Sequence, residues 1–123
     1  ENQASIIDAI QINAPFVIFS AVIMAPIVEE IVFRGVLYRK LRTPYRYLSA
    51  IMISSVSFGL MHVSQSLIEG NLIDLPFMIV YVILGLFFVK IYEETGKLSA
   101  AIWLHGLNNI IGIGAIMLSL YLI

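Results

Sequence analysis

Apolar residues occur along the chain in four long segments, and most of the charged residues lie in the short stretches between them. The segments cover residues 13–41, 47–64, 76–89 and 98–123. A helix needs about 20 apolar residues to cross a bilayer, with a range of about 17–25. The third segment is the shortest and needs part of its flanks to reach that length. The pattern therefore predicts an all-α, polytopic membrane protein with a core of four transmembrane helices.

Composition supports an integral membrane protein. Hydrophobic residues make up 60% of the 123 residues and charged residues only 12%, with a mean hydropathy of +0.97. A soluble domain has about 45–50% apolar and about 25% charged residues, and a chain this short cannot bury so much apolar surface in a core. The net charge of −1 gives no indication of nucleic-acid binding, and the absence of cysteine excludes disulfides and thiolate sites.

A single domain is expected to span residues 1–123, because no repeat or change of composition divides the chain. The sequence begins at Glu1 with no basic segment before the first apolar stretch. We therefore expect it to be part of a longer membrane protein rather than a protein with a signal peptide.

The basic residues predict the orientation of the helices. All seven form two clusters, which mark the first and third connections: Arg34, Arg39, Lys40, Arg42 and Arg46, then Lys90 and Lys97. Since cytoplasmic loops carry an excess of Lys and Arg, both connections are expected in the cytoplasm and both chain ends outside. A bacterial cell membrane is the expected location.

Two adjacent glutamates and an arginine interrupt the first apolar segment. A charged group near the bilayer centre costs about 2.5–3.5 kcal/mol on insertion scales. Glu30 and Arg34 are four residues apart and can neutralise each other across one helical turn. Glu29 lacks such a partner and becomes a candidate proton acceptor, unless both glutamates lie at a helix end among headgroups. Pro26 frees the Val22 carbonyl one turn earlier, although it is equally well explained as a packing kink.

The other polar residues inside apolar segments are two histidines and an asparagine. His62 lies in the second segment, and His105 and Asn109 share one helix face in the fourth. Gly106 and Gly112 would let another helix approach there. A histidine in such a place is often a packing residue with a hydrogen bond, and a polar pair often joins two transmembrane helices.

Taken together, these residues are expected to face one another, because polar side chains in a membrane bundle point to its interior. One glutamate, two histidines and an asparagine form an acid–base and oxyanion-binding set of the kind that amide hydrolysis needs. At a rise of 1.5 Å per residue, Glu29 lies about 15 Å along its helix from Arg39, and His105 lies about 12 Å from Lys97. His62 lies about 24 Å from Arg46, so it would lie deeper in the membrane. Either the second helix is strongly tilted or its basic end extends into the cytoplasm.

Three short motifs carry a resemblance to a known family. They are Glu29-Glu30-Ile31-Val32-Phe33-Arg34, Phe58-Gly59-Leu60-Met61-His62 and His105-Gly106-Leu107-Asn108-Asn109. In this order, each within an apolar segment, they resemble the motifs of the CAAX-protease and bacteriocin-processing (Abi) family of intramembrane endopeptidases. The resemblance implies a membrane peptidase that cleaves prenylated CAAX peptides, bacteriocin leaders or other membrane-associated peptides.

The same resemblance implies a role for each motif residue. Glu29 would be the general base, with His62 orienting the attacking water, and His105 and Asn109 would hold the oxyanion. Glu30 and Arg34 would be a structural ion pair. No cofactor is expected, but Glu29, His62 and His105 are also the ligand types of a catalytic zinc site. The non-enzymatic alternative is an immunity or scaffold protein that binds a peptide in the membrane without cleaving it.

Overall fold

The computed structural model describes residues 2–122, and side chains from residue 7 to residue 122. The first helical region contains α1 (Asn2–Phe19), η1 (Ser20–Met24), α2 (Ala25–Glu30), η2 (Ile31–Tyr38) and α3 (Arg39–Leu41), and it is followed by α4 (Tyr47–Ile68), α5 (Leu75–Thr95) and α6 (Leu98–Leu122). Residues 2–122 contain no strand. Four helical regions are long and apolar enough to cross a membrane. The predicted all-α fold with four spans is thus confirmed.

Two helices extend beyond their predicted ends. The third helix covers Leu75–Thr95 and gains about one and a half turns at its C-terminal end, so it reaches a spanning length with its flanks. The second helix continues to Ile68, four residues beyond the predicted end of the second segment. The turns themselves lie at Gly70 and Gly96, whose φ angles of 72° and 65° suit a residue without a Cβ atom.

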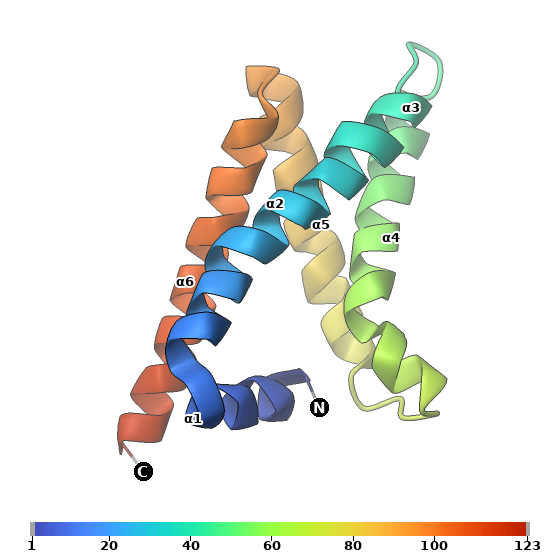
Figure 1. The fold of residues 1–123 in the computed structure, drawn as a ribbon. Coiled ribbons are helices and arrows are strands. Elements are labelled where there is room, and N and C mark those ends of the chain that lie inside the picture. The colour runs from blue at the N-terminus through green and yellow to red at the C-terminus, as the bar shows by residue number, and fades with distance from the viewer. Residues whose placement is uncertain (1, 123) are drawn as a thin grey trace.

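The first helical region is interrupted at Asn13, near the predicted start of the first span. Asn13 has φ −155° and ψ 76°, and its Oδ1 accepts the Phe16 N–H at 3.3 Å. Pro15 follows in the first turn, a position where its missing N–H costs nothing. Asn13 therefore caps a new helix, and Figure 1 shows the preceding residues lying across the ends of the other helices.

On either side of α2, the first helix adopts a π-helical register. In η1, the Ala25 N–H donates to the Ser20 carbonyl, five residues back. The next residue is Pro26, which has no N–H to continue this pattern. Because π-turns are rare and are frequently found at functional sites, their position beside Glu29 and Glu30 makes this part of the helix a candidate site.

The helices alternate in direction, and the first one crosses the others obliquely (Figure 1). The closest pair is α4 and α5, where a Cβ atom on Gly59 would lie 2.6 Å from a Val82 methyl carbon. The helix α6 contacts α5 on one side and α2 and η1 on the other. This arrangement brings the middle of the first helix between residues of α4, α5 and α6.

Candidate active site

Glu30 and Arg34 form an ion pair in the interior, as predicted. Arg34 Nη1 lies 3.0 Å from Glu30 Oε1, and both side chains are fully buried. The guanidinium also donates from Nη2 to the Gly85 carbonyl at 2.8 Å and lies over the Phe58 ring, 4.7 Å from its centroid. The arginine thus ties the first helix to α5 as well as neutralising the glutamate.

Glu30 has a second partner that the sequence did not predict. His105 Nδ1 of α6 lies 3.0 Å from the same oxygen, Glu30 Oε1. His105 is 3% exposed, so this contact is shielded from solvent. Glu30 therefore connects Arg34 on its own helix to the histidine of the fourth span.

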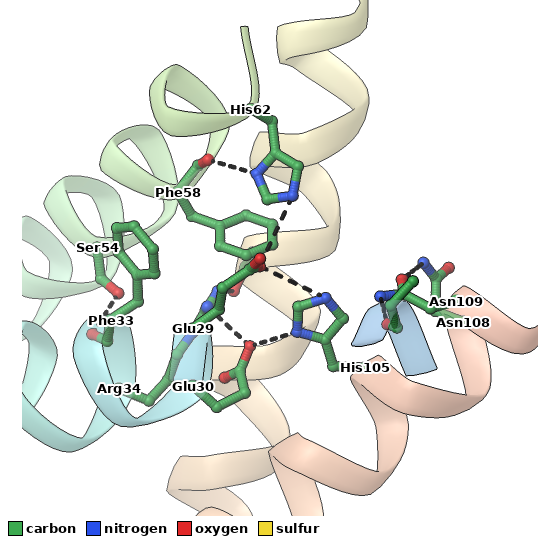
Figure 2. A network of polar contacts seen from close by, with 12 residues as sticks. Glu29, Glu30, Phe33, Arg34, Ser54, Phe58, His62, His105, Asn108 and Asn109 are labelled. Carbon is green, nitrogen blue, oxygen red and sulfur yellow. Dashed lines mark hydrogen bonds and ion pairs between the residues drawn. The ribbon is translucent and has the colours of Figure 1, made fainter. Parts of the chain in front are cut away.

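Glu29 faces both histidines. Its Oε2 atom lies 3.7 Å from His62 Nε2 and 3.7 Å from His105 Nε2, and Figure 2 shows the two rings pointing toward it from different helices. Three of the four predicted catalytic residues are thus brought together. The unequal distances counted along the sequence do not keep them apart, because Glu29 Oε2 lies within 3.7 Å of both imidazoles.

The contacts of Nδ1, the ring nitrogen that does not face Glu29, define the tautomer of each histidine. His62 Nδ1 lies 2.9 Å from the Phe58 carbonyl oxygen, which can only accept a hydrogen bond. His105 Nδ1 faces Glu30 Oε1, the oxygen that is also paired with Arg34. We therefore assign the proton to Nδ1 in both rings. Each Nε2 is then an acceptor in the neutral ring and a donor in the imidazolium.

The charges of the cluster do not cancel while both histidines are neutral. Glu29 and Glu30 carry two negative charges, whereas Arg34 carries one positive charge. The guanidinium of Arg34 contacts Glu30 directly. Glu29 Oε2 is buried and has no hydrogen-bond partner within 3.5 Å among the described residues. Since an uncompensated buried charge is costly, Glu29 is the charged residue of the cluster that stands out as lacking a direct partner.

Asn109 does not join the glutamate and the histidines. Its Nδ2 donates to the Ala21 carbonyl at 2.8 Å, and its Oδ1 accepts from Asn108 at 3.3 Å. In the π register of η1, Pro26 would be the donor to Ala21 and lacks the hydrogen. Asn109 thus binds the carbonyl of Ala21, which directly precedes the Val22 carbonyl that Pro26 was predicted to free. Figure 2 shows both asparagines to the side of His105.

The two glycines near Asn109 differ. A Cβ atom at Gly106 would lie 3.0 Å from the Val22 carbonyl oxygen, so this glycine permits the close approach of α6 to the first helix. The corresponding expectation for Gly112 is wrong, because nothing lies within 4 Å of a Cβ atom there. The contact between these helices is therefore centred on the turn of α6 that carries His105 and Asn109.

Aromatic rings surround the histidines, and sequence reasoning missed most of them. Tyr81 stacks on His62 with ring centroids 4.3 Å apart, and Phe88 stacks on His105 at 4.6 Å. Phe58 contacts both imidazoles, at 4.4 Å and 5.6 Å. Aromatic residues in an apolar helix are ordinary, so the sequence offers no signal that separates Tyr81 and Phe88 from their neighbours.

The zinc alternative stays a prediction. The His62 and His105 Nε2 atoms each lie 3.7 Å from Glu29 Oε2, beyond hydrogen-bond distance. By the geometric criterion for metal sites, residues 7–122 contain no group of three or more His, Cys, Asp or Glu side chains placed to hold a metal ion. Metal dependence is therefore a question for a chelator experiment.

Comparison with known proteins identifies relatives of the chain. The family described as type II CAAX prenyl endopeptidase Rce1-like matches residues 11–111. The chain is 32% identical over 109 residues to a Bacillus subtilis (strain 168) protein named "Putative membrane peptidase YdiL", covering 89% of the chain and 40% of that protein. It is 35% identical over 100 residues to "UPF0177 protein YaiH" of Lactococcus lactis subsp. lactis (strain IL1403), covering 80% and 37%. The chain thus spans about two fifths of the length of these relatives. No solved structure matches it significantly.

Proposed function

The chain belongs to the Rce1-like family of type II CAAX prenyl endopeptidases, and on this premise we propose that it is the core of a glutamate-dependent intramembrane endopeptidase. The observation that carries the proposal is the convergence of two imidazole Nε2 atoms on Glu29 Oε2. A carboxylate whose Oε2 atom is buried between two imidazole rings is suited to general-base chemistry. A peptide-binding scaffold would have no need of such a base.

Water activation is the first proposed step. A water molecule beside Glu29 Oε2 donates one proton to the carboxylate and its second hydrogen bond to His62 Nε2, which is an acceptor because Nδ1 carries the ring proton. The water oxygen then attacks the scissile carbonyl carbon. Glu29 later delivers the proton to the leaving amine nitrogen, so the carboxylate is regenerated when the peptide bond breaks.

Stabilisation of the oxyanion is assigned to α6. Glu30 Oε1 lies 3.0 Å from His105 Nδ1 and orients the ring, and we propose that a protonated His105 donates from Nε2–H to the developing negative charge. Asn109 has one amide hydrogen engaged with Ala21 and a second that is available for the same oxyanion. Glu30 therefore supports the chemistry through His105, in addition to its ion pair with Arg34.

The substrate class and the location of the protein are also proposals, and the family membership supports them. We propose membrane-associated peptides as substrates, with prenylated CAAX peptides and bacteriocin-like peptides as the two classes to test. We further propose that the protein lies in a bacterial cell membrane, with the connections after α3 and after α5 in the cytoplasm. The described helices alternate in direction, as this orientation requires (Figure 1).

The test is single-turnover cleavage of a prenylated CAAX peptide by the full-length protein and its Glu29→Gln variant in detergent or vesicles. Gln keeps the size of the side chain and removes its basicity, so we expect a rate at least about 10²–10⁴-fold lower with the fold intact. Glu94→Gln, an exposed carboxylate on α5, is the matched control and should cleave at the wild-type rate.

Two further measurements separate the alternatives. Treatment with a chelator and metal analysis of the purified protein would show whether zinc is needed, and loss of activity on chelation with recovery on adding zinc would overturn the glutamate-only mechanism. Full activity of Glu29→Gln would remove the proposed base. Absence of cleavage of either peptide class by the wild-type protein, with binding retained, would favour a scaffold.

A further inference from the structure

The helix α5 carries none of the motif residues, yet it contacts both histidines. Tyr81, Gly85 and Phe88 follow one another at intervals of four and three residues, so they lie along one face of the helix. Tyr81 stacks on His62 with 24° between the ring planes, and Phe88 stacks on His105 with 17°. One face of one helix thus supplies a parallel ring to each imidazole.

We propose that Tyr81 and Phe88 are positioning residues that hold the two imidazole rings in the plane that directs both Nε2 atoms at Glu29. The proposal rests on the proposed function for its kinetic consequence, because a misplaced ring matters to a reaction only if the rings take part in it. Its structural content, the orientation of each ring, can be measured without any activity.

The hydrogen bonds of the histidines do not fix the ring planes by themselves. Each ring makes one short contact at Nδ1, 2.9 Å for His62 and 3.0 Å for His105, and the contacts from Nε2 to Glu29 are 3.7 Å long. The outer side-chain torsion of histidine is broad and roughly two-fold. A ring held only at Nδ1 can therefore turn about this contact and carry Nε2 away from the carboxylate.

Stacking removes this freedom. The His62 ring contacts both Tyr81 and Phe58, with centroids at 4.3 and 4.4 Å. His105 lies parallel to Phe88 at 4.6 Å, with the Phe58 ring edge-on at 5.6 Å. Turning either imidazole would drive it into an aromatic ring, so these contacts restrain the torsion that the hydrogen bonds leave free.

Gly85 sets the distance at which α5 presents the two rings. Its carbonyl accepts Arg34 Nη2 at 2.8 Å, midway along the face between Tyr81 and Phe88. A Cβ atom here would lie 3.1 Å from the Ser55 Cα atom and 3.2 Å from Arg34 Nη2. The glycine therefore lets α5 approach both α4 and the buried guanidinium, and the aromatic residues on either side of it reach one histidine each.

The experiment combines kinetics with nuclear magnetic resonance of the full-length protein. This chain has only two histidines, His62 and His105, and histidines elsewhere in the protein can be identified by single substitution. Tyr81→Leu should lower kcat by about 10²-fold, with little change in KM. A loss of this size is expected when a catalytic group is displaced by about 1 Å. The ¹⁵N signals of the His62 ring should broaden or double while those of His105 stay sharp.

Three further variants act as controls. Tyr81→Phe keeps the stacking ring and should retain both the wild-type kcat and the sharp His62 signals. Phe88→Leu should affect His105 instead of His62. Phe87→Leu removes an exposed aromatic residue of the same helix, and it should leave both histidine spectra and kcat unchanged.

Each outcome bears on the proposal. A folded Tyr81→Leu variant with wild-type kcat and a sharp, unshifted His62 signal would overturn it, as would an equal loss in Tyr81→Phe. If Phe88→Leu does not fold, the Tyr81 variants decide. If the wild-type protein cleaves no peptide, the proposed function fails, whereas the histidine spectra still confirm or refute the positioning.

Discussion

Removal of the Arg34 charge tests whether the ion pair stabilises the interior of the bundle. The perturbation is Arg34→Met, which keeps an unbranched side chain of similar length between the Phe58 and Phe88 rings and removes the guanidinium. Arg34 and Glu30 are both fully buried, and Nη1 lies 3.0 Å from Oε1. After the substitution, Glu30 keeps His105 as its only direct partner among the contacts described above.

The magnitude follows from the burial of both groups. Breaking a buried ion pair by removing one partner costs about 3–5 kcal/mol, because the other charge is left uncompensated. At 1.36 kcal/mol for each factor of ten, this corresponds to a ratio of folded to unfolded protein lower by about 10² to 10³·⁷. The cation–π contacts of Arg34 with Phe58 at 4.7 Å and Phe88 at 5.3 Å add to the loss.

The assay is equilibrium unfolding in detergent, followed by circular dichroism, for Arg34→Met and for Arg34→Met combined with Glu30→Gln. Gln removes the carboxylate charge that lost its partner, and its Oε1 can still accept a hydrogen bond from His105 Nδ1. We expect the double variant to recover at least about 1 kcal/mol, within the range of coupling energies between contacting residues. Arg39→Met, an exposed arginine at the end of the same helix, should change stability by less than about 0.5 kcal/mol.

Two results would refute this reasoning. Wild-type stability of Arg34→Met would mean that the pair is solvated in the membrane-embedded protein. A double variant less stable than the single one would mean that the Glu30 charge has its main partner elsewhere, and His105 would be the residue to examine.

The remaining predictions concern the helix contacts and the orientation. Asn109→Ala should lower the free energy of unfolding by about 1–3 kcal/mol, because the Ala21 carbonyl loses its hydrogen-bond donor. It should also slow cleavage by about 10²–10³-fold, because one donor to the oxyanion is lost. Unchanged stability in the unfolding assay would contradict the hydrogen bond to Ala21. Gly85→Ala should destabilise by about 1–3 kcal/mol through overpacking, whereas Gly114→Ala, with open space around it, should be neutral. Single cysteines replacing Arg42 and Glu69 should react with impermeant reagents from opposite sides of the membrane, and labelling of both from one side would rule out the proposed topology.

The sequence was informative where a single helix or the contrast between lipid and water decides the structure. The four spans follow from hydropathy alone, because charged side chains are excluded from the interior of a bilayer. The pair formed by Glu30 and Arg34 follows from the spacing of four residues on one helix. The meeting of Glu29 with His62 and His105 follows from the high cost of exposing polar groups to lipid.

The contacts that the sequence did not predict join residues from different helices. The second partner of Glu30 depends on how α6 lies against the first helix, and no spacing encodes that. Tyr81 and Phe88 belong to a helix that is apolar on all sides, so no periodic pattern indicates which face is turned to the site. The bond between Asn109 and Ala21 depends on how α6 lies against the π-helical segment Ser20–Met24, and the sequence does not indicate that segment.

The π-helical segments also bear on how the length of this chain can vary among relatives. A residue inserted into or deleted from an α-helix rotates everything beyond it by about 100°, and within α2 such a change would move Glu29 or Glu30 off the face that meets the histidines. A π-turn instead accommodates one extra residue in a widened turn. Loss of one residue from Ser20–Met24 or Ile31–Tyr38 can therefore restore α-helical geometry while the flanking residues keep their facing. Single-residue gaps in alignments with relatives are expected in these two segments and absent from Ala25–Glu30.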